Sequence, residues 1–461
     1  MKKEMDFTTG NLFKKMNIYA IPLILSGLLQ LLFSAADLIV CGNYGSSNSV
    51  GAISSTSALT SLIINLFIGI SVGSNVLMSR AYGAKDKEKG QRVVYTSMVY
   101  SLVIGFAVAA FGFIFSYQLL KMQKTNDEII DLSNQYLQMY FIGVFFMMIY
   151  NFGASILRAV GDTKRPFIFL TIAGIINIIF NFIFVCGFHL DTLGVGIATA
   201  ISQAVSAILI VIALMRYKGF FHFKLKEMKA YRQEGKQIIW IGIPAGLQSV
   251  IFSISNVIIQ SSINSLGTYV VNGSGAATSI EGFIYTSMEQ TCFTCIAFMS
   301  ANYAIHNAKN IRKILINSFL MIIIYDFIFS GIVLLFSRQL VSIYVKDEAS
   351  IIEGQQRIVI LAATYAICGF CDVMASAIRG INYQILPTIV TAFGICGTRL
   401  IFIFLFFPQQ QFHSLAAISW SYPISWIITL AIHFICYEVL YNKFKKICNK
   451  PKESELTLKV I

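Results

Sequence analysis

The sequence predicts an all-α integral membrane protein with twelve transmembrane helices in two pseudo-symmetric six-helix bundles. Hydrophobic residues occupy 56% of the 461 positions and charged residues only 12%, against roughly 45–50% and about 25% in soluble domains. Apolar stretches of the length needed to cross a bilayer, about 20 residues, recur along the chain. The second half of the sequence also repeats the first, which predicts two related bundles.

The repeat has a nearly constant offset. Residues 157–166 return as residues 378–387, 221 positions later, and Pro22 returns as Pro244, 222 positions later. Two similar helical bundles in one membrane chain are typical of secondary transporters, whose binding sites lie near the bilayer midplane between the repeats. The duplication therefore indicates a function as well as a fold.

Charged or turn-forming residues separate the apolar stretches, and the eighth stretch is the least apolar. We expect spans at residues 16–40, 52–79, 93–120, 133–157, 167–188, 192–215, 237–262, 272–301, 314–336, 356–378, 387–407 and 413–441.

Positive charge is distributed unevenly around these spans. Of the 35 Lys and Arg residues, 29 fall at the termini and in the even-numbered loops, 5 in the odd-numbered loops or at the edge of a span next to them, and Arg399 deep inside a span. By the positive-inside rule, we expect a multi-pass protein of the cell (plasma) membrane with both termini in the cytoplasm. The net charge of +13 thus reflects topology and does not indicate a nucleic-acid partner.

The predicted domains follow from the repeat and the spans. The segment 216–236 is the longest polar interval and holds seven Lys and Arg with two Glu, so attraction to anionic lipid is a secondary role expected for it. We divide the chain into an N-terminal six-helix bundle (1–215), a cytoplasmic basic linker (216–236), a C-terminal six-helix bundle (237–441) and a cytoplasmic tail (442–461).

Asp37 is the clearest candidate for a functional residue, because a carboxylate inside an apolar span normally faces a partner or an ion path. Its spacing places it on one helical stripe with three polar residues of the same span, Ser26, Gln30 and Ser34. The alternative is that Asp37 only caps the outer end of the first span.

Three further polar residues are candidates to join Asp37. Asn177 and Asn181 of the fifth span are one turn apart and share a face, and Thr199 of the sixth span could meet them across a helix pair. Together these residues would offer a carboxylate, amide oxygens and a hydroxyl, which suit a small hard cation such as sodium. Coupling to protons would need the carboxylate alone. Plain hydrogen bonding between helices is an equally open alternative.

A second group of polar residues lies in the C-terminal half. Glu281 and Tyr285 are one turn apart in the eighth span, Asp372 lies in the tenth span, and Arg399 lies in the eleventh. An arginine within the membrane needs a partner, and we expect Asp372 or Glu281 to supply it. The group either binds substrate or only locks helices together.

Pro22 and Pro244 lie near the start of the first span of each half. A proline inside a helix removes one amide donor and bends the helix. The two bends are expected to act as hinges or to remain static kinks.

The sequence shows no catalytic constellation. Its five histidines are scattered without metal-ligand spacing, and it has no phosphate-binding loop or nucleophile elbow. The pairs Cys292-x-x-Cys295 and Cys368-x-x-Cys371 fall inside spans, where cysteine usually packs as a small apolar residue, although this spacing indicates zinc or redox chemistry in soluble proteins. We expect neither an enzyme nor a cofactor, and no metal beyond a coupling sodium ion at Asp37.

Four segments carry recognisable motifs: the first span with Pro22 and Asp37 and its continuation 41–45, the Tyr-Gly-Ala segment 79–86, the Arg-Ala-Val-Gly-Asp loop 158–166, and the entry to the sixth span at 193–200. In their order and spacing they resemble the multidrug and toxic compound extrusion (MATE) family of transporters. With the duplication, the resemblance covers residues 10 to about 440.

The resemblance implies two six-helix lobes and alternating access, in which influx of sodium or protons expels amphiphilic, often cationic compounds. It also implies a cation site in the N-terminal lobe formed by Asp37, Asn177, Asn181 and Thr199. One branch of the family carries aspartate at the position of Asn181. The amide therefore argues against a relay of two carboxylates and leaves Asp37 as the main titratable group.

The resemblance is weaker in the C-terminal lobe. A second branch of the family places a glutamate in the seventh span, but residues 245–262 contain no acid, so a cation site of that type is not expected. Asp372 also lies one turn closer to Arg379 than the tenth-span acid of that branch.

The leading hypothesis is a cation-coupled antiporter, driven by sodium or protons, that exports amphiphilic, cationic small molecules and works as a monomer in the lipid bilayer. The alternative is a flippase of lipid-linked oligosaccharides or precursors from the same superfamily. Those relatives usually have fourteen spans and a cavity rich in basic residues. Twelve spans and one arginine within a span favour the antiporter.

Overall fold

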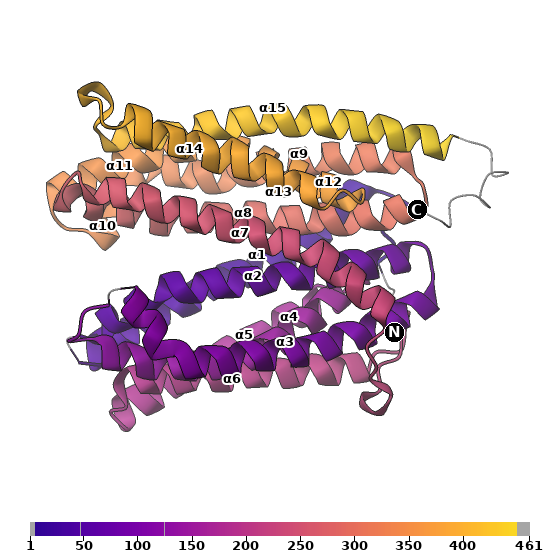
Figure 1. Ribbon diagram of the computed structural model, residues 1–461, viewed down its shortest axis with the longest axis horizontal. Helices are drawn as coiled ribbons and strands as arrows, with labels where there is room; N and C mark the ends of the chain where they lie inside the picture. Colours follow the sequence, from indigo (N-terminus) through magenta and orange to yellow (C-terminus); the bar gives the residue numbers. More distant parts are fainter. Residues whose placement is uncertain (1–4, 47, 124, 450–461) are drawn as a thin grey trace. The chain divides into compact units, whose positions relative to one another are not determined.

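The computed structural model describes residues 5–46, 48–123 and 125–449, and these residues form helices and no strand. Figure 1 shows the helices in chain order. In the first half they are α1 (Leu12–Tyr44), α2 (Ser49–Gly83), α3 (Lys87–Met122), α4 (Ile130–Ala159), α5 (Lys164–Asn181), the π-helix η1 (Phe182–Gly187), α6 (Asp191–Met215) and the 3-10 helix η2 (Leu225–Glu227). In the second half they are α7 (Arg232–Asn264), α8 (Thr268–Ala304), α9 (Ala308–Leu335), α10 (Ser337–Tyr344), α11 (Glu348–Ala362), α12 (Tyr365–Gly380), α13 (Ile385–Thr391), the π-helix η3 (Ala392–Gly397), α14 (Thr398–Ile401), the π-helix η4 (Phe402–Phe406), the 3-10 helix η5 (Gln410–Phe412) and α15 (Leu415–Cys448).

The predicted all-helical membrane fold is confirmed. Within the described ranges, 10 helical segments are long and apolar enough to cross a membrane, and the bent pair α11 and α12 would bring the number to 11. The remaining predicted span, 272–301, coincides with α8, which has 37 residues. Its length suffices to cross a bilayer, but its polar residues keep it below the apolar character of the others.

The helices pack into two compact units. Among the described residues, unit 1 comprises residues 5–6 and Asn17–Ile254, and unit 2 comprises Phe7–Met16 and residues 255–449. The boundaries fall inside α1 and α7, so each of these helices contributes to both units. The division at the linker, into 1–215 and 237–441, remains a prediction.

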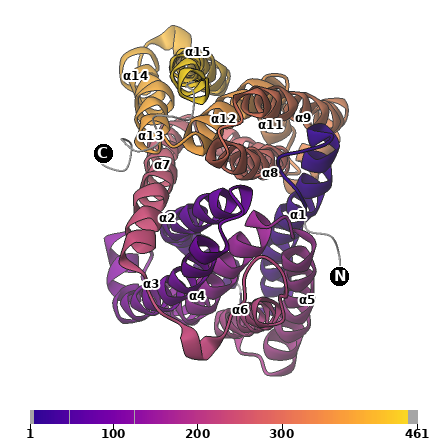
Figure 2. The ribbon, with the colours of Figure 1, turned by 90° about the vertical axis from the view of Figure 1, so that its right-hand side faces the viewer.

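Unit 1 is built around α4. This helix packs against α2, α3 and α6, and the end-on view in Figure 2 shows it among them. Leu77, Met148, Phe152 and Ile210 are fully buried in the core that these helices share. Because lipid tails are as apolar as these side chains, close van der Waals packing rather than removal from water holds such helices together.

The linker between the repeats packs against the start of α3. The side chain of Gln91 donates to the backbone carbonyl of His222 and accepts from its amide. The hydroxyl of Tyr95 donates to Glu227 at 2.9 Å, and Phe221 beside this contact is buried. The linker is therefore a docked segment of unit 1.

Unit 2 is built around α8 and α12, which pack against each other and against α9; α15 packs against α11 and α12. The axes of α11 and α12 differ by 47°. At the break, Thr364 Oγ1 donates to the backbone carbonyls of Ile360 at 2.9 Å and Leu361 at 3.2 Å. A side chain that competes for helix carbonyls favours a bend, and this one needs no proline.

The fold also repeats an irregularity. The π-helix η1 and the π-helix η4 begin at residues 182 and 402, 220 positions apart, so the equivalent spans of the two halves share the same wide turn. Such turns are rare and often occur at functional sites.

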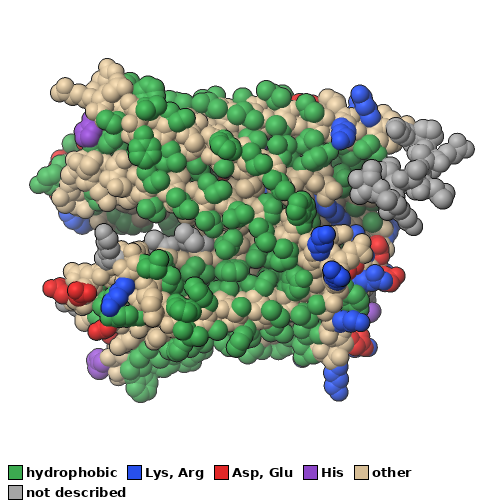
Figure 3. Space-filling model, viewed as in Figure 1, with side chains coloured by type: hydrophobic (Ala, Val, Ile, Leu, Met, Phe, Trp, Pro, Cys, Tyr) green, Lys and Arg blue, Asp and Glu red, His purple; other side chains and the backbone are tan. Residues whose placement is uncertain are grey.

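The surface agrees with a membrane environment. On the face shown in Figure 3, hydrophobic side chains cover the middle of the helices in each unit, and Lys and Arg gather mainly at one end. Large exposed apolar side chains among the described residues include Phe106, Phe327 and Phe393, which are 68%, 82% and 78% exposed. A surface of this kind is compatible with lipid and not with water.

Candidate functional site

A glycine allows α1 to approach α5. A side chain at Gly174 would collide with the ring of Phe33, so only glycine permits this contact. Asp37 follows Phe33 by one helical turn, and Asn177 and Asn181 follow Gly174 by one and two turns. The contact thus brings the carboxylate of α1 beside the two amides of α5.

The four predicted residues form a continuous chain of hydrogen bonds within unit 1. Asn181 Nδ2 donates to Asp37 Oδ1 at 2.5 Å and to Asn177 Oδ1 at 3.4 Å. Asn177 Nδ2 donates to Thr199 Oγ1 of α6 at 3.5 Å. Because α1 continues to Tyr44, Asp37 lies inside the helix and points toward α5.

This arrangement leaves an oxygen available for a cation. Asn177 and Asn181 are 5% and 0% exposed, and Asn181 Oδ1 accepts no hydrogen bond from the described residues. A buried acceptor without a donor is costly, and a cation would satisfy it. The carboxylate of Asp37, this amide oxygen and the hydroxyl of Thr199 are hard ligands of the kind that sodium prefers.

Two tyrosines of α4 lie near the carboxylate. The rings of Tyr136 and Tyr140 are 5.8 Å apart, and both side chains interact electrostatically with Asp37. Tyr136 also packs in a small buried cluster with Val40 and Cys41 of α1. Sequence reasoning does not place these tyrosines beside Asp37, because their contact with α1 depends on tertiary packing.

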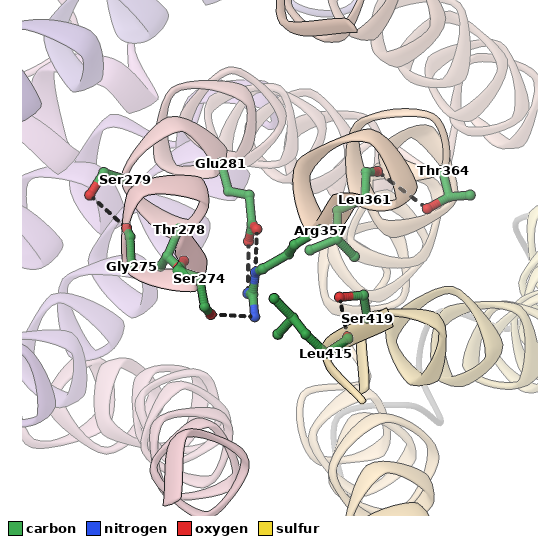
Figure 4. A network of polar contacts seen from close by, with 10 residues as sticks. All are labelled: Ser274, Gly275, Thr278, Ser279, Glu281, Arg357, Leu361, Thr364, Leu415 and Ser419. Atoms are coloured by element: carbon green, nitrogen blue, oxygen red, sulfur yellow. Dashed lines mark hydrogen bonds and ion pairs between the residues drawn. The ribbon is translucent and has the colours of Figure 1, made fainter. Parts of the chain in front are cut away.

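The polar group predicted in the C-terminal half forms a different ion pair from the one predicted for Arg399. Arg357 Nε donates to Glu281 Oε1 at 2.9 Å, its Nη2 donates to Oε2 at 3.3 Å, and its Nη1 donates to Ser274 Oγ at 3.2 Å, as Figure 4 shows. Glu281 therefore pairs with Arg357 and not with Arg399. Arg357 stands at the edge of the predicted tenth span, where a charge favours assignment to a loop.

Arg399 packs against aromatic rings. It is fully buried, its Nε donates to Ser425 Oγ at 3.0 Å, and its guanidinium lies 3.9 Å from the centroid of Tyr422 and 5.8 Å from that of Trp426. The guanidinium of Arg357 lies 5.5 Å from the same Tyr422 ring. Cation–π contacts stabilise such buried charges, so Tyr422 links the two arginines.

The other members of this group lie beside α12. Asp372 interacts electrostatically with Arg379 and Arg399, and Tyr285 of α8 interacts with Asp372. The structure thus brings Asp372, Tyr285 and Arg399 into one electrostatic neighbourhood, whereas Glu281 is engaged by another residue.

Pro22 and Pro244 both lie inside helices, α1 and α7, and both belong to unit 1. Ser26 Oγ donates to the Pro22 carbonyl at 2.7 Å. Their action as hinges stays a prediction.

The cysteines are all free thiols. In unit 2, Cys371 Sγ lies 3.6 Å from Nδ1 of His433. Groups of three or more His, Cys, Asp or Glu side chains able to hold a metal ion are absent from the part of the chain that the structure describes.

Comparison with known proteins bears on this site. A family model described as MatE matches residues 22–183 and again residues 244–405. The two matches are offset by 222 positions, in agreement with the internal repeat.

Similar proteins of known description extend over most of the chain. The "Probable multidrug resistance protein YoeA" of Bacillus subtilis (strain 168) is 23% identical over 442 residues, which cover 94% of this chain and 95% of that protein. The "Probable multidrug resistance protein YpnP" of the same strain is 27% identical over 399 residues, 85% of this chain and 88% of that protein.

A solved structure described as the outward-facing conformation of a multidrug resistance MATE family transporter of the MOP superfamily superimposes with a TM-score of 0.89 at 20% identity. The alignment covers 97% of this chain and 99% of that one. At this identity the likeness shows a common fold.

Proposed function

This chain belongs to the MatE family of multidrug efflux transporters, and we propose that it is a cation-coupled antiporter, driven by sodium or protons, that exports amphiphilic, cationic small molecules by alternating access. The chain of contacts from Asp37 through Asn181 and Asn177 to Thr199 is the observation that carries this proposal. It supplies one charged oxygen ligand and neutral oxygens in a buried setting, which is what a transported cation requires.

Coupling needs two states with different affinity for the driving cation, because a ligand shifts an equilibrium only through such a difference. In our proposal the cation binds at Asp37 when the site faces one side of the membrane. Substrate binding competes with it or alternates with it, so influx of the cation drives export of the substrate. Pro22 and Pro244 would serve as hinges in the helices that contribute to both units.

The choice between sodium and protons depends on the number of carboxylates. The neutral side chain of Asn181 leaves Asp37 as the single acid in the hydrogen-bonded chain, so one proton or one monovalent cation per cycle would balance its charge. Both ions are compatible with this donor set.

The substrate is proposed by class alone. Amphiphile pockets consist mainly of shape and apolar area with few fixed polar groups, and the relatives described as multidrug resistance proteins support a small-molecule substrate. We propose that the group of Tyr285, Asp372 and Arg399 contributes polar contacts in unit 2. Glu281 acts through Arg357 and stabilises helix packing.

We further propose that the protein resides in the cell membrane as a monomer with both termini in the cytoplasm. The excess of Lys and Arg on one side of the predicted spans supports this orientation. The proposed domains are the bundles 1–215 and 237–441, joined by the linker 216–236 and followed by the tail 442–461.

The test is efflux of a fluorescent organic cation from vesicles, with the sodium and pH gradients imposed separately. The wild type should export the dye when one of the two gradients is present, and Asp37→Asn should lose this gradient-dependent efflux at normal expression. Asp131→Asn, at the exposed start of α4, is the matched control and should transport normally. Unchanged efflux by Asp37→Asn would remove Asp37 from the mechanism.

A further inference from the structure

A second carboxylate, Asp191, fastens the loop that follows α1. Asp191 is the first residue of α6. Its Oδ1 accepts hydrogen bonds from Ser49 Oγ and, at 3.9 Å, from Cys41 Sγ, and its Oδ2 accepts from the amide of Ser46 at 3.4 Å. One side chain of α6 therefore holds the last turn of α1, the connecting loop and the first turn of α2.

The chain accepts unfavourable local geometry to make these contacts. Asp191 has φ = 52°, in the left-handed region that a residue with a side chain enters only at a cost. A Cβ at Gly45 would lie 2.8 Å from Asp191 Oδ1 and equally close to Ser49 Oγ. The close approach of the loop to the carboxylate thus depends on a glycine in the loop.

The contacts of Asp191 with Cys41, Ser46 and Ser49, which we call the clamp, lie one helical turn from the proposed coupling site. Cys41 follows Asp37 by four residues on α1, so both side chains lie on the same face. Val40 and Cys41 also pack in a buried cluster with Val195 of α6. Since α6 carries Thr199 two turns after Asp191, the helix that grips α1 is the helix that ends the hydrogen-bonded chain.

We propose that Asp191 is a positioning residue for the cation site: by holding the outer end of α1 on α6, it sets the rotation and depth at which Asp37 meets Asn181. This inference rests on the proposed function, because it takes Asp37 as the residue that binds the driving cation. Asp191 does not touch the cation and acts through the placement of α1.

The consequence is a specific kinetic signature. A site that is ordered before the ligand arrives binds more tightly than one that the ligand must order. Without the clamp, the cation itself must hold α1 in place, so its affinity falls. The chemistry at Asp37 is unchanged, and transport at saturating cation should therefore remain close to that of the wild type.

The experiment measures dye efflux from proteoliposomes as a function of sodium chloride at fixed pH, and separately as a function of pH without sodium. In Asp191→Ala the half-saturating concentration of the driving cation should rise about tenfold, as expected for loss of hydrogen bonds to a charged group. The maximal rate should stay within about twofold of the wild type. Asp191→Asn retains an acceptor for Ser49 and should show a smaller rise.

Labelling gives a readout independent of transport. Cys41 is fully buried, and its modification by N-ethylmaleimide can be quantified by peptide mass spectrometry. Cys41 should be labelled faster in Asp191→Ala than in the wild type. Ser49→Ala should also raise the half-saturating cation concentration and speed the labelling of Cys41. Asp131→Ala, which removes an exposed carboxylate at the start of α4, should match the wild type in both assays.

The outcomes separate the inference from the function on which it rests. If Asp37→Asn loses gradient-driven efflux while Asp191→Asn, Asp191→Ala and Ser49→Ala keep the wild-type half-saturating concentration, the positioning role is wrong. Faster labelling of Cys41 without any change in that concentration has the same meaning, because the clamp is then only structural. If Asp37→Asn still couples efflux to a gradient, the proposed coupling site fails, whatever Asp191 does.

Discussion

Arg357 and Glu281 form an ion pair whose side chains are only 4% and 10% exposed. The pair joins α11 to α8 one and a half turns before the break between α11 and α12. Two charges so far from water are stable only together, because each would lose its hydration without compensation if the other were absent. The pair therefore locks the first half of a broken span.

Removing one partner of this pair should destabilise the protein more than replacing both partners by apolar residues. We expect Glu281→Gln or Arg357→Met to reduce the free energy of unfolding by about 3 kcal/mol or more, since either change leaves one partner buried and uncompensated. The double variant Glu281→Leu with Arg357→Met should lose less than either single variant. The measurement is thermal unfolding of the purified protein in detergent, followed by tryptophan fluorescence.

The control is an ion pair that involves the same helix. Arg338 and Glu348 are 52% and 61% exposed, and exposed pairs contribute about 1 kcal/mol or less. Glu348→Gln should therefore leave the unfolding temperature nearly unchanged. If the double variant lost as much free energy of unfolding as the two single variants together, the two side chains would not stabilise each other.

Gly174 should be essential for coupling, because a larger residue there displaces Phe33 and with it α1. We expect Gly174→Val to reduce gradient-driven dye efflux at least tenfold at normal expression. Gly187→Val is the matched control, since a Cβ at Gly187 meets no atom within 4 Å. Adding Phe33→Ala to Gly174→Val should restore part of the efflux. If the Gly174→Val variant transports normally, the approach of α1 to α5 does not position Asp37.

Helical periodicity predicted which polar residues of one helix share a face, and the family resemblance predicted that Asp37 meets Asn177, Asn181 and Thr199. Asn177 and Asn181 share a face at a spacing of four, and Asp37 is the only acid in an otherwise apolar span. Both facts follow from 3.6 residues per turn and from the cost of charge in lipid. The spans themselves follow from apolar length.

The sequence could not predict contacts that arise from the approach of distant helices. The pairing of Arg357 with Glu281 depends on how α11 lies on α8. The close contact of Gly69 on α2 with Gly246 on α7, which places the first part of α7 in unit 1, depends likewise on tertiary packing. The bend between α11 and α12 arises from the hydroxyl of Thr364 and not from a proline, so it carries no strong local signal.

Asn181→Asp should make transport depend more strongly on pH than it does in the wild type. The new carboxylate would lie at hydrogen-bond distance from Asp37, since the present amide donates to it at 2.5 Å, and two carboxylates that close share one proton. We expect efflux driven by a pH gradient to increase at least threefold relative to the wild type. The assay is dye efflux from vesicles without sodium. Asn43→Asp, at an exposed residue of the same helix as Asp37, should have no effect, and an Asn181→Asp variant with wild-type pH dependence would argue against a direct contact.

The docked linker should keep its full protection through the physiological pH range and loosen slightly only in acid. Hydrogen bonds from Lys224 and Tyr95 hold the pKa of Glu227 below its ordinary value of 4.5. A depressed pKa means that the carboxylate stabilises docking fully above pH 4.5 and loses this effect as the pH falls through the lower folded-state value. Because Glu227 is exposed, solvent screening keeps the effect small.

Hydrogen exchange of residues 217–231, expressed as protection factors, should therefore be constant from pH 8 to pH 5 and fall below pH 4.5. Glu227→Gln should remove the acid-dependent step, and a loss of protection already between pH 8 and pH 6 would show that another group controls docking.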